Sequence, residues 1–159
     1  DLTPSFSSSA VVYAVSESQQ AGFAYVGTNS FPHACLWSGT AATYIDLHPT
    51  GATASEAYAA SGGQQAGYAV VGGVPHASFW SGTAASWVDL NPAGFNFSVA
   101  RSITPDGINT YIAGYGYSSV TNRYEALLWS QPVPEPATLW ALGAGMLVLA
   151  CRKRDAKQS

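Results

Sequence analysis

The feature that most limits what this chain can fold into is an internal repeat with a period of 43–45 residues. A segment that reads Asp-Leu-x-Pro begins at Asp1, Asp46 and Asp89, at steps of 45 and 43 residues. The ten residues at 33–42 recur almost unchanged at 76–85. The chain therefore divides into three tandem units, which span residues 1–45, 46–88 and 89–130.

Each unit is predicted to contain short β-strands, because short apolar pieces alternate with residues that permit tight turns. In the second unit these pieces are residues 55–60, 65–71, 76–80 and 86–90, the last of which opens the next unit. Four strands in a period of this length are typical of one blade of a β-propeller. The 16 glycines and nine prolines also argue against a helical bundle, since both residues weaken helix interiors.

The sequence thus predicts an all-β fold, in which tandem four-stranded blades form an incomplete or open β-propeller. Three blades are too few for a closed ring, which typically needs about four to eight. The sequence also begins at Asp1, inside a repeat and without a hydrophobic signal segment. We therefore expect either the C-terminal fragment of a longer chain or an open arrangement of blades.

The repeat resembles the HAF-type extracellular repeats of bacteria, whose units read Ala-x-Leu-Trp, then Asp-Leu, then a Gly-x-Val-Val-Gly strand. Residues 33–130 carry this pattern well, and residues 1–32 carry it more loosely. The glycine that follows Asp-Leu in that family is replaced here by x-Pro, so the local turn can differ. The resemblance implies that the body of the protein is an extracellular repeat domain.

The C-terminal region carries a second feature, an apolar stretch at residues 137–151 that contains no charged side chain. Arg152, Lys153 and Arg154 follow it directly, and basic residues beside such a stretch stay on the cytoplasmic side of a membrane. We therefore predict a transmembrane helix at 137–151 and a basic cytoplasmic tail at 152–159. At about 1.5 Å per residue this helix is shorter than the ~30 Å hydrocarbon core, so a buried core helix is the alternative.

A short linker at residues 131–136 precedes that stretch and contains the motif Val133, Pro134, Glu135 and Pro136. Together with the apolar stretch and the basic cluster, the motif resembles the PEP-CTERM sorting signal of Gram-negative bacteria. The resemblance implies transit through the inner membrane, cleavage near Pro-Glu-Pro by an exosortase-like membrane protease, and delivery to the cell surface or extracellular matrix. The two prolines also keep the segment extended, which suits a protease substrate. The alternative is a Pro-rich linker before a plain membrane anchor.

The repeat region, residues 1–130, contains two basic and seven acidic side chains, so it has no cationic surface for nucleic acid. The sequence lacks the motifs of nucleophile-elbow, phosphate-loop and dinucleotide-binding enzymes.

His33 and His76 occupy equivalent positions, with Glu125 in the third unit, which is typical of packing rather than catalysis. His48 is predicted to lie in a surface turn. We expect no metal site, because no histidine pair has the spacing of zinc ligands.

Asp46 and Asp89 recur with the period, as does Asp1. We interpret them as repeat-structural residues that close turns by accepting backbone N–H bonds, with calcium binding as the alternative. Cys35 is predicted to lie in a strand and Cys151 at the membrane edge, so we expect no disulfide between them.

Aromatic residues also recur, since Trp37, Trp80 and Trp129 each end a predicted strand. We expect these three side chains to fill the space between blades. Exposed aromatic rings can instead stack on sugars. The candidates for binding extracellular polysaccharide are Trp87, Tyr115 and Tyr117.

These observations predict an exported, non-enzymatic repeat protein that needs no cofactor and is delivered to the cell surface or extracellular matrix. Its expected partners are the sorting protease during transit, and then polysaccharide or other proteins. A secreted propeller enzyme or lectin-like module that acts on polysaccharide is one alternative. A single-pass anchored protein that is never cleaved is the other.

Overall fold

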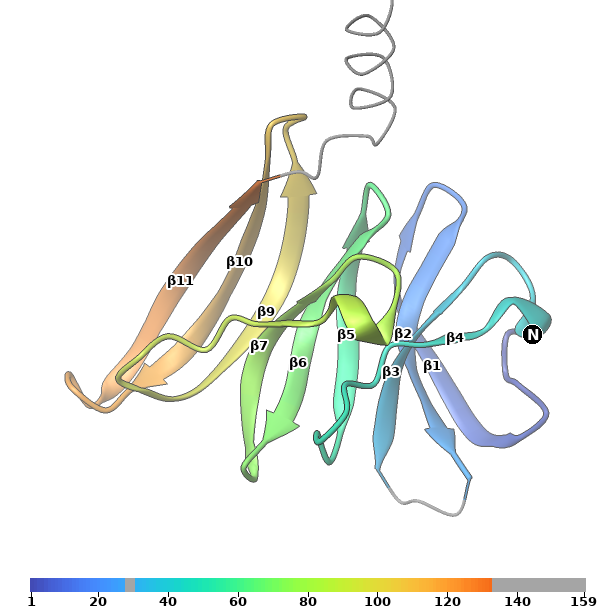
Figure 1. The fold of residues 1–159 in the computed structure, drawn as a ribbon, viewed down its shortest axis with the longest axis horizontal. Coiled ribbons are helices and arrows are strands. Elements are labelled where there is room, and N and C mark those ends of the chain that lie inside the picture. The colour runs from blue at the N-terminus through green and yellow to red at the C-terminus, as the bar shows by residue number, and fades with distance from the viewer. Residues whose placement is uncertain (28–30, 133–159) are drawn as a thin grey trace, which may run out of the picture.

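The structure, a computed structural model, describes residues 1–27 and 31–132. These residues form three antiparallel β-sheets that stand side by side along the long axis of the molecule (Figure 1). The first sheet contains β1 (Ser7–Ser16), β2 (Gln19–Val26), β3 (Pro32–Trp37) and β4 (Ile45–Asp46). The second contains β5 (Ser55–Ser61), β6 (Gln64–Val71), β7 (Val74–Trp80) and β8 (Val88–Asp89). The third contains β9 (Phe95–Pro105), β10 (Asn109–Ser118) and β11 (Arg123–Pro132).

The prediction of an all-β fold is confirmed, because the described residues hold these sheets and only two short 3₁₀ helices, η1 (Ala41–Thr43) and η2 (Ala84–Ser86). Among the described residues the sheets have four, four and three strands, and the place where the repeat predicts a fourth strand of the third sheet lies after Pro132, outside those residues. In the described part of the chain, the first sheet contacts the second and the second contacts the third, and no closed propeller forms.

Two further predictions concern the ends of the units. The strand expected at 86–90, which was counted as the fourth of the second unit and the opening of the third, forms as β8 and pairs with β7 as the fourth strand of the second sheet. The transmembrane helix expected at 137–151 lies outside the described residues. Within residues 1–27 and 31–132, neither 3₁₀ helix has the length and apolar character that a membrane crossing needs.

Every sheet has two distinct faces, because successive side chains of a strand point to opposite sides. We call one side the Trp face, after Trp37, Trp80 and Trp129 in the three sheets. We call the other the Leu face, after Leu36, Phe79 and Leu128, which directly precede those tryptophans. Between neighbouring sheets, the Trp face of the later sheet packs against the Leu face of the earlier one.

The hydrophobic core lies in these interfaces between sheets. The first interface joins Ala21, Ala34 and Leu36 of the first sheet to Ala57 and Trp80 of the second, with Leu47 between them. The second joins Ala66, Ala77 and Phe79 to Ala100, Ile103 and Ile112, with Leu90 between them. Alanine at the same strand positions lets the sheets approach closely, while the aromatic side chains fill the remaining volume.

A β-bulge recurs at the same place in the first strand of every sheet. The extra residue is Tyr13 in β1, Tyr58 in β5 and Arg101 in β9. Each bulge lies opposite a glycine of the second strand: Gly22, Gly67 and Gly114. A methyl group on Gly67 would lie 1.9 Å from the carbonyl oxygen of Glu56, so only glycine fits beside this bulge. The bulge changes the direction in which the extra side chain points. Of these three side chains, Tyr13 and Arg101 are exposed and Tyr58 is half-buried.

Candidate functional site

The predicted sorting motif begins directly after the last strand of the body, since β11 ends at Pro132. Its residues all lie outside the described part of the chain: Val133, Pro134, Glu135, Pro136, Arg152, Lys153 and Arg154. The other residues singled out in the sequence lie in the described body, apart from Cys151.

Asp46 and Asp89 end the short strands β4 and β8, and each makes the same pair of contacts. One oxygen of Asp46 accepts the backbone N–H of His48 at 2.8 Å, and the other lies 3.0 Å from Nδ1 of His33. The equivalent contacts of Asp89 are with the N–H of Asn91 at 2.8 Å and with Nδ1 of His76 at 2.7 Å. Each aspartate thus closes a turn and connects it to the neighbouring strand.

His48, predicted to lie in a surface turn, lies in the loop between β4 and β5, where it is half-buried and contacts residues of two units. Its Nδ1 lies 2.8 Å from the hydroxyl of Ser55, and its Nε2 lies 3.0 Å from the carbonyl oxygen of Ala52. Its ring also stacks on His33, with ring centroids 3.8 Å apart. Burial, and then the neighbouring His33, lower the pKa of His48, so the neutral imidazole is favoured.

The recurring tryptophans belong to the hydrophobic clusters of the body: Trp80 and Trp129 lie in the interfaces between sheets, and Trp37 packs within the first unit. Trp37 and Trp80 are fully buried, and Trp129 donates from its indole N–H to the carbonyl oxygen of Leu90 at 2.8 Å. Trp87, expected to be free for sugar stacking, instead packs against the first interface. Its indole N–H donates to the hydroxyl of Ser78 at 2.9 Å, so this ring is already engaged within the fold.

An aromatic row, which sequence reasoning missed, crosses all three sheets. Its members are Phe23, Tyr13, Tyr58, Tyr68, Arg101 and Tyr115. They are the three extra residues of the bulges and the three residues that follow the bulge glycines. The signal was therefore present in the sequence as Gly-aromatic pairs at the repeat period, but the bulges that bring these residues together were not recognised.

The rings of the row are in contact from one sheet to the next. The ring centroids of Tyr13 and Phe23 are 5.7 Å apart, and those of Tyr13 and Tyr58 are 5.0 Å apart. The guanidinium of Arg101 lies 4.2 Å from the centroid of Tyr58 and 5.7 Å from that of Tyr115. Tyr13 is 48% exposed and Arg101 is exposed, whereas Phe23 is buried, so the row reaches the surface at Tyr13 and Arg101.

The surroundings of the row favour the neutral phenols of Tyr58 and Tyr68. Burial, and then the charge of Glu56, raise the pKa of Tyr58 to about 12. Burial also raises the pKa of Tyr68, whose hydroxyl donates to Glu56 at 2.8 Å. A hydrogen bond from Arg101 to the hydroxyl of Tyr115 raises the pKa of the guanidinium. The row is thus a line of aromatic rings that includes one cation, Arg101, and has one carboxylate, Glu56, beside it.

Tyr115 and Tyr117, both named as candidates from the sequence, belong to one aromatic cluster on the third sheet. Phe97 and Tyr124 complete it, and Tyr124 lies at a centroid distance of 5.3 Å from Tyr117 and 6.1 Å from Tyr115. Tyr115 also belongs to the aromatic row, so the cluster continues the row at its end on the third sheet.

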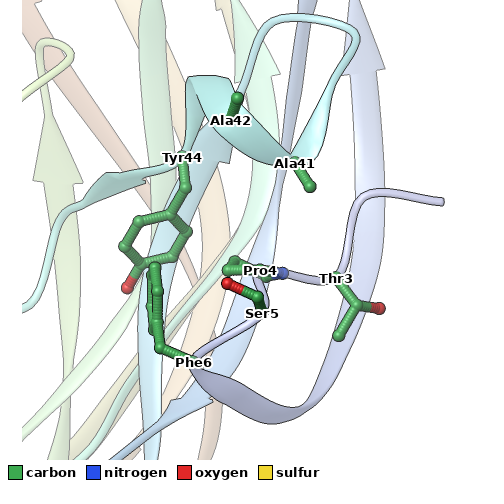
Figure 2. A pocket seen from close by; sticks show the side chains of 7 residues that line it. All are labelled: Thr3, Pro4, Ser5, Phe6, Ala41, Ala42 and Tyr44. Atoms are coloured by element: carbon green, nitrogen blue, oxygen red, sulfur yellow. The ribbon is translucent and has the colours of Figure 1, made fainter.

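A pocket of about 390 Å³ opens beside the first sheet (Figure 2). It is lined by Thr3, Pro4, Ser5, Phe6, Ala41, Ala42 and Tyr44. The rings of Phe6 and Tyr44 meet edge to face, with centroids 5.2 Å apart. Burial, and then the nearby Asp46, raise the pKa of Tyr44, so the phenol is neutral at pH 7. With no charged group in its lining, this pocket offers apolar contact rather than acid–base chemistry.

Neither metal binding nor thiol chemistry is indicated by the part of the chain that the structure describes. No group of three or more His, Cys, Asp or Glu side chains in that part is arranged to hold a metal ion. Cys35 is fully buried, and burial raises the pKa of its thiol, so it is not a reactive nucleophile.

Comparison with known proteins identifies the tail. A family model described as the PEP-CTERM protein-sorting motif matches residues 132–154. The match supports export and sorting through the C-terminus, so the protein passes through the membrane and is secreted or held at the cell surface. Motifs of this kind are generally processed by an exosortase. No curated protein and no solved structure matches the chain, and the HAF-type resemblance of the body remains an expectation.

Proposed function

We propose that this protein is cleaved by an exosortase-like protease of a Gram-negative bacterium and placed at the cell surface or in the matrix, where its body binds polysaccharide without enzymatic activity. The observation that carries the binding proposal is the aromatic row, which continues across all three sheets. A row of this kind matches a linear polymer, because an exposed ring such as Tyr13 can stack on one sugar while its neighbours along the row contact the next ones.

The charge of the body favours a neutral polysaccharide. Residues 1–130 hold seven acidic and two basic side chains, so an anionic polymer would be repelled at low ionic strength. Beside the row, Arg101 supplies hydrogen-bond donors and Glu56 supplies acceptors, and both suit sugar hydroxyls. The ring faces of the tyrosines supply the apolar contact.

The absence of enzymatic activity is part of the proposal. Hydrolysis of a glycosidic bond typically needs two carboxyl groups, about 5–10 Å apart, on either side of the bond. Among the described residues, the carboxylate in contact with the row is Glu56, and it accepts a hydrogen bond from Tyr68. Release of reducing ends from a bound polysaccharide by the wild-type protein would contradict the proposal that the body has no enzymatic activity.

The binding proposal is tested by electrophoresis of the full chain, in detergent micelles, through gels that contain a neutral β-glucan or the anionic polymer alginate. We expect the glucan to retard the wild-type protein and alginate not to. Tyr13→Ala should weaken binding about tenfold, which is about 1.4 kcal/mol, and leave the melting temperature nearly unchanged, since Tyr13 is half exposed.

The matched control is Phe6→Ala, since Phe6 is also an exposed aromatic residue but contacts Tyr44 rather than the row. Its retardation should equal that of the wild-type protein. Equal retardation of Tyr13→Ala and the wild-type protein would contradict binding at the row. Loss of binding in Phe6→Ala alone would place the site in the pocket instead.

A further inference from the structure

Two tyrosines from different units, Tyr13 and Tyr58, meet where the first sheet contacts the second. Their ring centroids are 5.0 Å apart, which is the shortest of the tyrosine–tyrosine contacts among the described residues. Each is the extra residue of a bulge, one in β1 and the other in β5, and these two strands contact each other. The equivalent bulges of two neighbouring sheets therefore bring two phenols together.

The ring of Tyr58 is held in position on its other sides. Its centroid lies 5.7 Å from that of Tyr68, and the guanidinium of Arg101 lies 4.2 Å from the centroid. Tyr58 is half-buried, so its neighbours restrict how far the ring can turn. Tyr13 thus faces a ring with a nearly fixed position, and little movement is needed for the two rings to reach each other.

A proton acceptor, the carboxylate of Glu56, lies beside this pair. It accepts a hydrogen bond from the hydroxyl of Tyr68 at 2.8 Å. Burial, and then the charge of Glu56, raise the pKa of Tyr13 and of Tyr58, so the carboxylate acts on both phenols. One-electron oxidation of a phenol releases its proton, and a carboxylate nearby can accept it. The surroundings of the pair therefore favour oxidation of these tyrosines.

The sheets of the described body are not joined by a disulfide. Cys35 is the cysteine of that part of the chain, and it is a buried free thiol. Proteins that are secreted or held at the cell surface, as the sorting motif indicates for this one, are often strengthened by covalent cross-links, because their surroundings are oxidising. A pair of adjacent tyrosines offers such a link without cysteine.

We propose that Tyr13 and Tyr58 form an oxidative modification site, at which a carbon–carbon bond joins the two rings as dityrosine. The oxidant is hydrogen peroxide, used by a haem peroxidase outside the cell. Each phenol loses one electron and one proton, and the two radicals couple through the ring carbons next to their hydroxyl groups. The hydrogen atoms on those carbons then move to the two oxygens. The two electrons and two protons reduce hydrogen peroxide to two water molecules, so the cross-linked pair has two hydrogen atoms fewer.

The cross-link connects the first sheet to the second, so it acts on the stability of the body. It closes a loop that contains the rest of the first sheet and the start of the second. A cross-link of this kind restricts the unfolded chain and thereby favours the folded one. The urea midpoint of the oxidised wild-type protein should therefore exceed that of Tyr13→Phe treated in the same way, and equal midpoints would contradict this effect.

Peptide mapping of the full chain in detergent micelles, after treatment with a haem peroxidase and hydrogen peroxide, tests the proposal. A protease that cuts after glutamate separates the two tyrosines, because cuts after Glu17, Glu56 and Glu125 give the peptides 1–17 and 57–125. Mass spectrometry should find these two peptides joined, with a mass two hydrogen atoms below their sum. Tyr13 is the only tyrosine of peptide 1–17, so the joined product identifies it directly.

The variants Tyr13→Phe and Tyr58→Phe should each lose the joined peptides, because phenylalanine keeps the ring and its packing but cannot form a phenoxyl radical. The matched control is Tyr25→Phe, since the ring of Tyr25 contacts Phe23 rather than another tyrosine. This variant should give the joined peptides in the wild-type amount. Tyr13→Phe also keeps a ring face for a sugar, so the result does not depend on polysaccharide binding.

Three results would overturn the proposal. The first is a wild-type protein whose peptides 1–17 and 57–125 stay separate although dityrosine forms elsewhere or not at all. The second is joined peptides that persist in Tyr58→Phe, which would give Tyr13 a different partner. The third is joined peptides found only in covalent dimers on a denaturing gel, which would show that the bond forms between chains.

Discussion

His48 and Asn91 occupy equivalent positions in successive units, and each connects a buried serine hydroxyl to a backbone carbonyl four residues further along the chain. His48 does so with Ser55 and Ala52, and Asn91 lies 2.6 Å from the hydroxyl of Ser98 and 3.4 Å from the carbonyl oxygen of Phe95. An imidazole and an amide thus perform the same structural role, but only the imidazole can be protonated.

The first prediction is that this difference makes the stability of the body depend on pH. The pKa of His48 is lower in the folded protein than its ordinary value of 6.5, so the unfolded chain binds the extra proton first. The free energy of unfolding contributed by this group is therefore complete above pH 6.5 and falls as the pH drops below it. His48→Asn should retain the bridge and reduce this dependence.

Thermal melts followed by circular dichroism between pH 7.5 and pH 5 check this prediction. The melting temperature of the wild-type protein should fall over that range by more than that of His48→Asn. An equal fall in both proteins would show that His48 is not the group responsible.

The second prediction concerns the recurring bulge. Gly67→Ala should destabilise the body by about 3 kcal/mol, at the upper end of the range for overpacking, because the methyl group would meet the carbonyl oxygen of Glu56. Gly73→Ala is the control, since nothing lies near its added methyl group and only its φ of +87° is unfavourable. It should cost about 1–2 kcal/mol. Urea unfolding measures both variants, and a smaller loss for Gly67→Ala than for Gly73→Ala would contradict the bulge geometry.

The third prediction concerns the aspartates that close the turns. Asp46→Ala and Asp89→Ala should each lower the free energy of unfolding by about 0.5–2 kcal/mol, as at sites where a side chain caps a backbone N–H. Asp46→Asn retains an acceptor for the N–H of His48 and should lose less. If Asp46→Ala abolished polysaccharide binding without changing the urea midpoint, its role would be functional rather than structural.

The sequence was sufficient to predict the class of the fold, because the period and its turn residues determine where strands begin and end. The repeated Asp-Leu segment was assigned to the start of a unit, yet β8 pairs with β7, since strand pairing depends on contacts between segments rather than on the order of motifs. The predicted fourth strand of the third sheet falls after Pro132, outside the described residues, so that part of the prediction remains a prediction.

The candidate site was only partly predictable. Tyr115 was named from its position outside the repeat, whereas Tyr13, Tyr58 and Arg101 were missed because a bulge changes which way a side chain points. Without the bulge, strict alternation along the strand gives no reason to place these residues in one row. The hydrogen bond of Trp87 to Ser78 could not be predicted, because it depends on the pairing of β7 with β8.

The protein is proposed to be cleaved near its C-terminus. Substitutions in the Pro-Glu-Pro motif should prevent this cleavage. Replacing Pro134, Glu135 and Pro136 with alanine removes two prolines, a residue type that interrupts helices and favours an extended backbone. A helix can then run into the apolar stretch, so the protein should remain uncut in the inner membrane. Replacing Arg152, Lys153 and Arg154 with glutamine should instead weaken retention and orientation, by about 1 kcal/mol for each charge lost at an anionic leaflet.

Mass spectrometry of the protein recovered from the surface of a host with the sorting machinery tests this claim most directly. The mature wild-type protein should end near the Pro-Glu-Pro motif and lack the apolar stretch at 137–151, while the alanine variant should be found only in the membrane at full length. A surface protein whose C-terminal peptide still ends at Ser159 would contradict the account and would identify the tail as a permanent anchor.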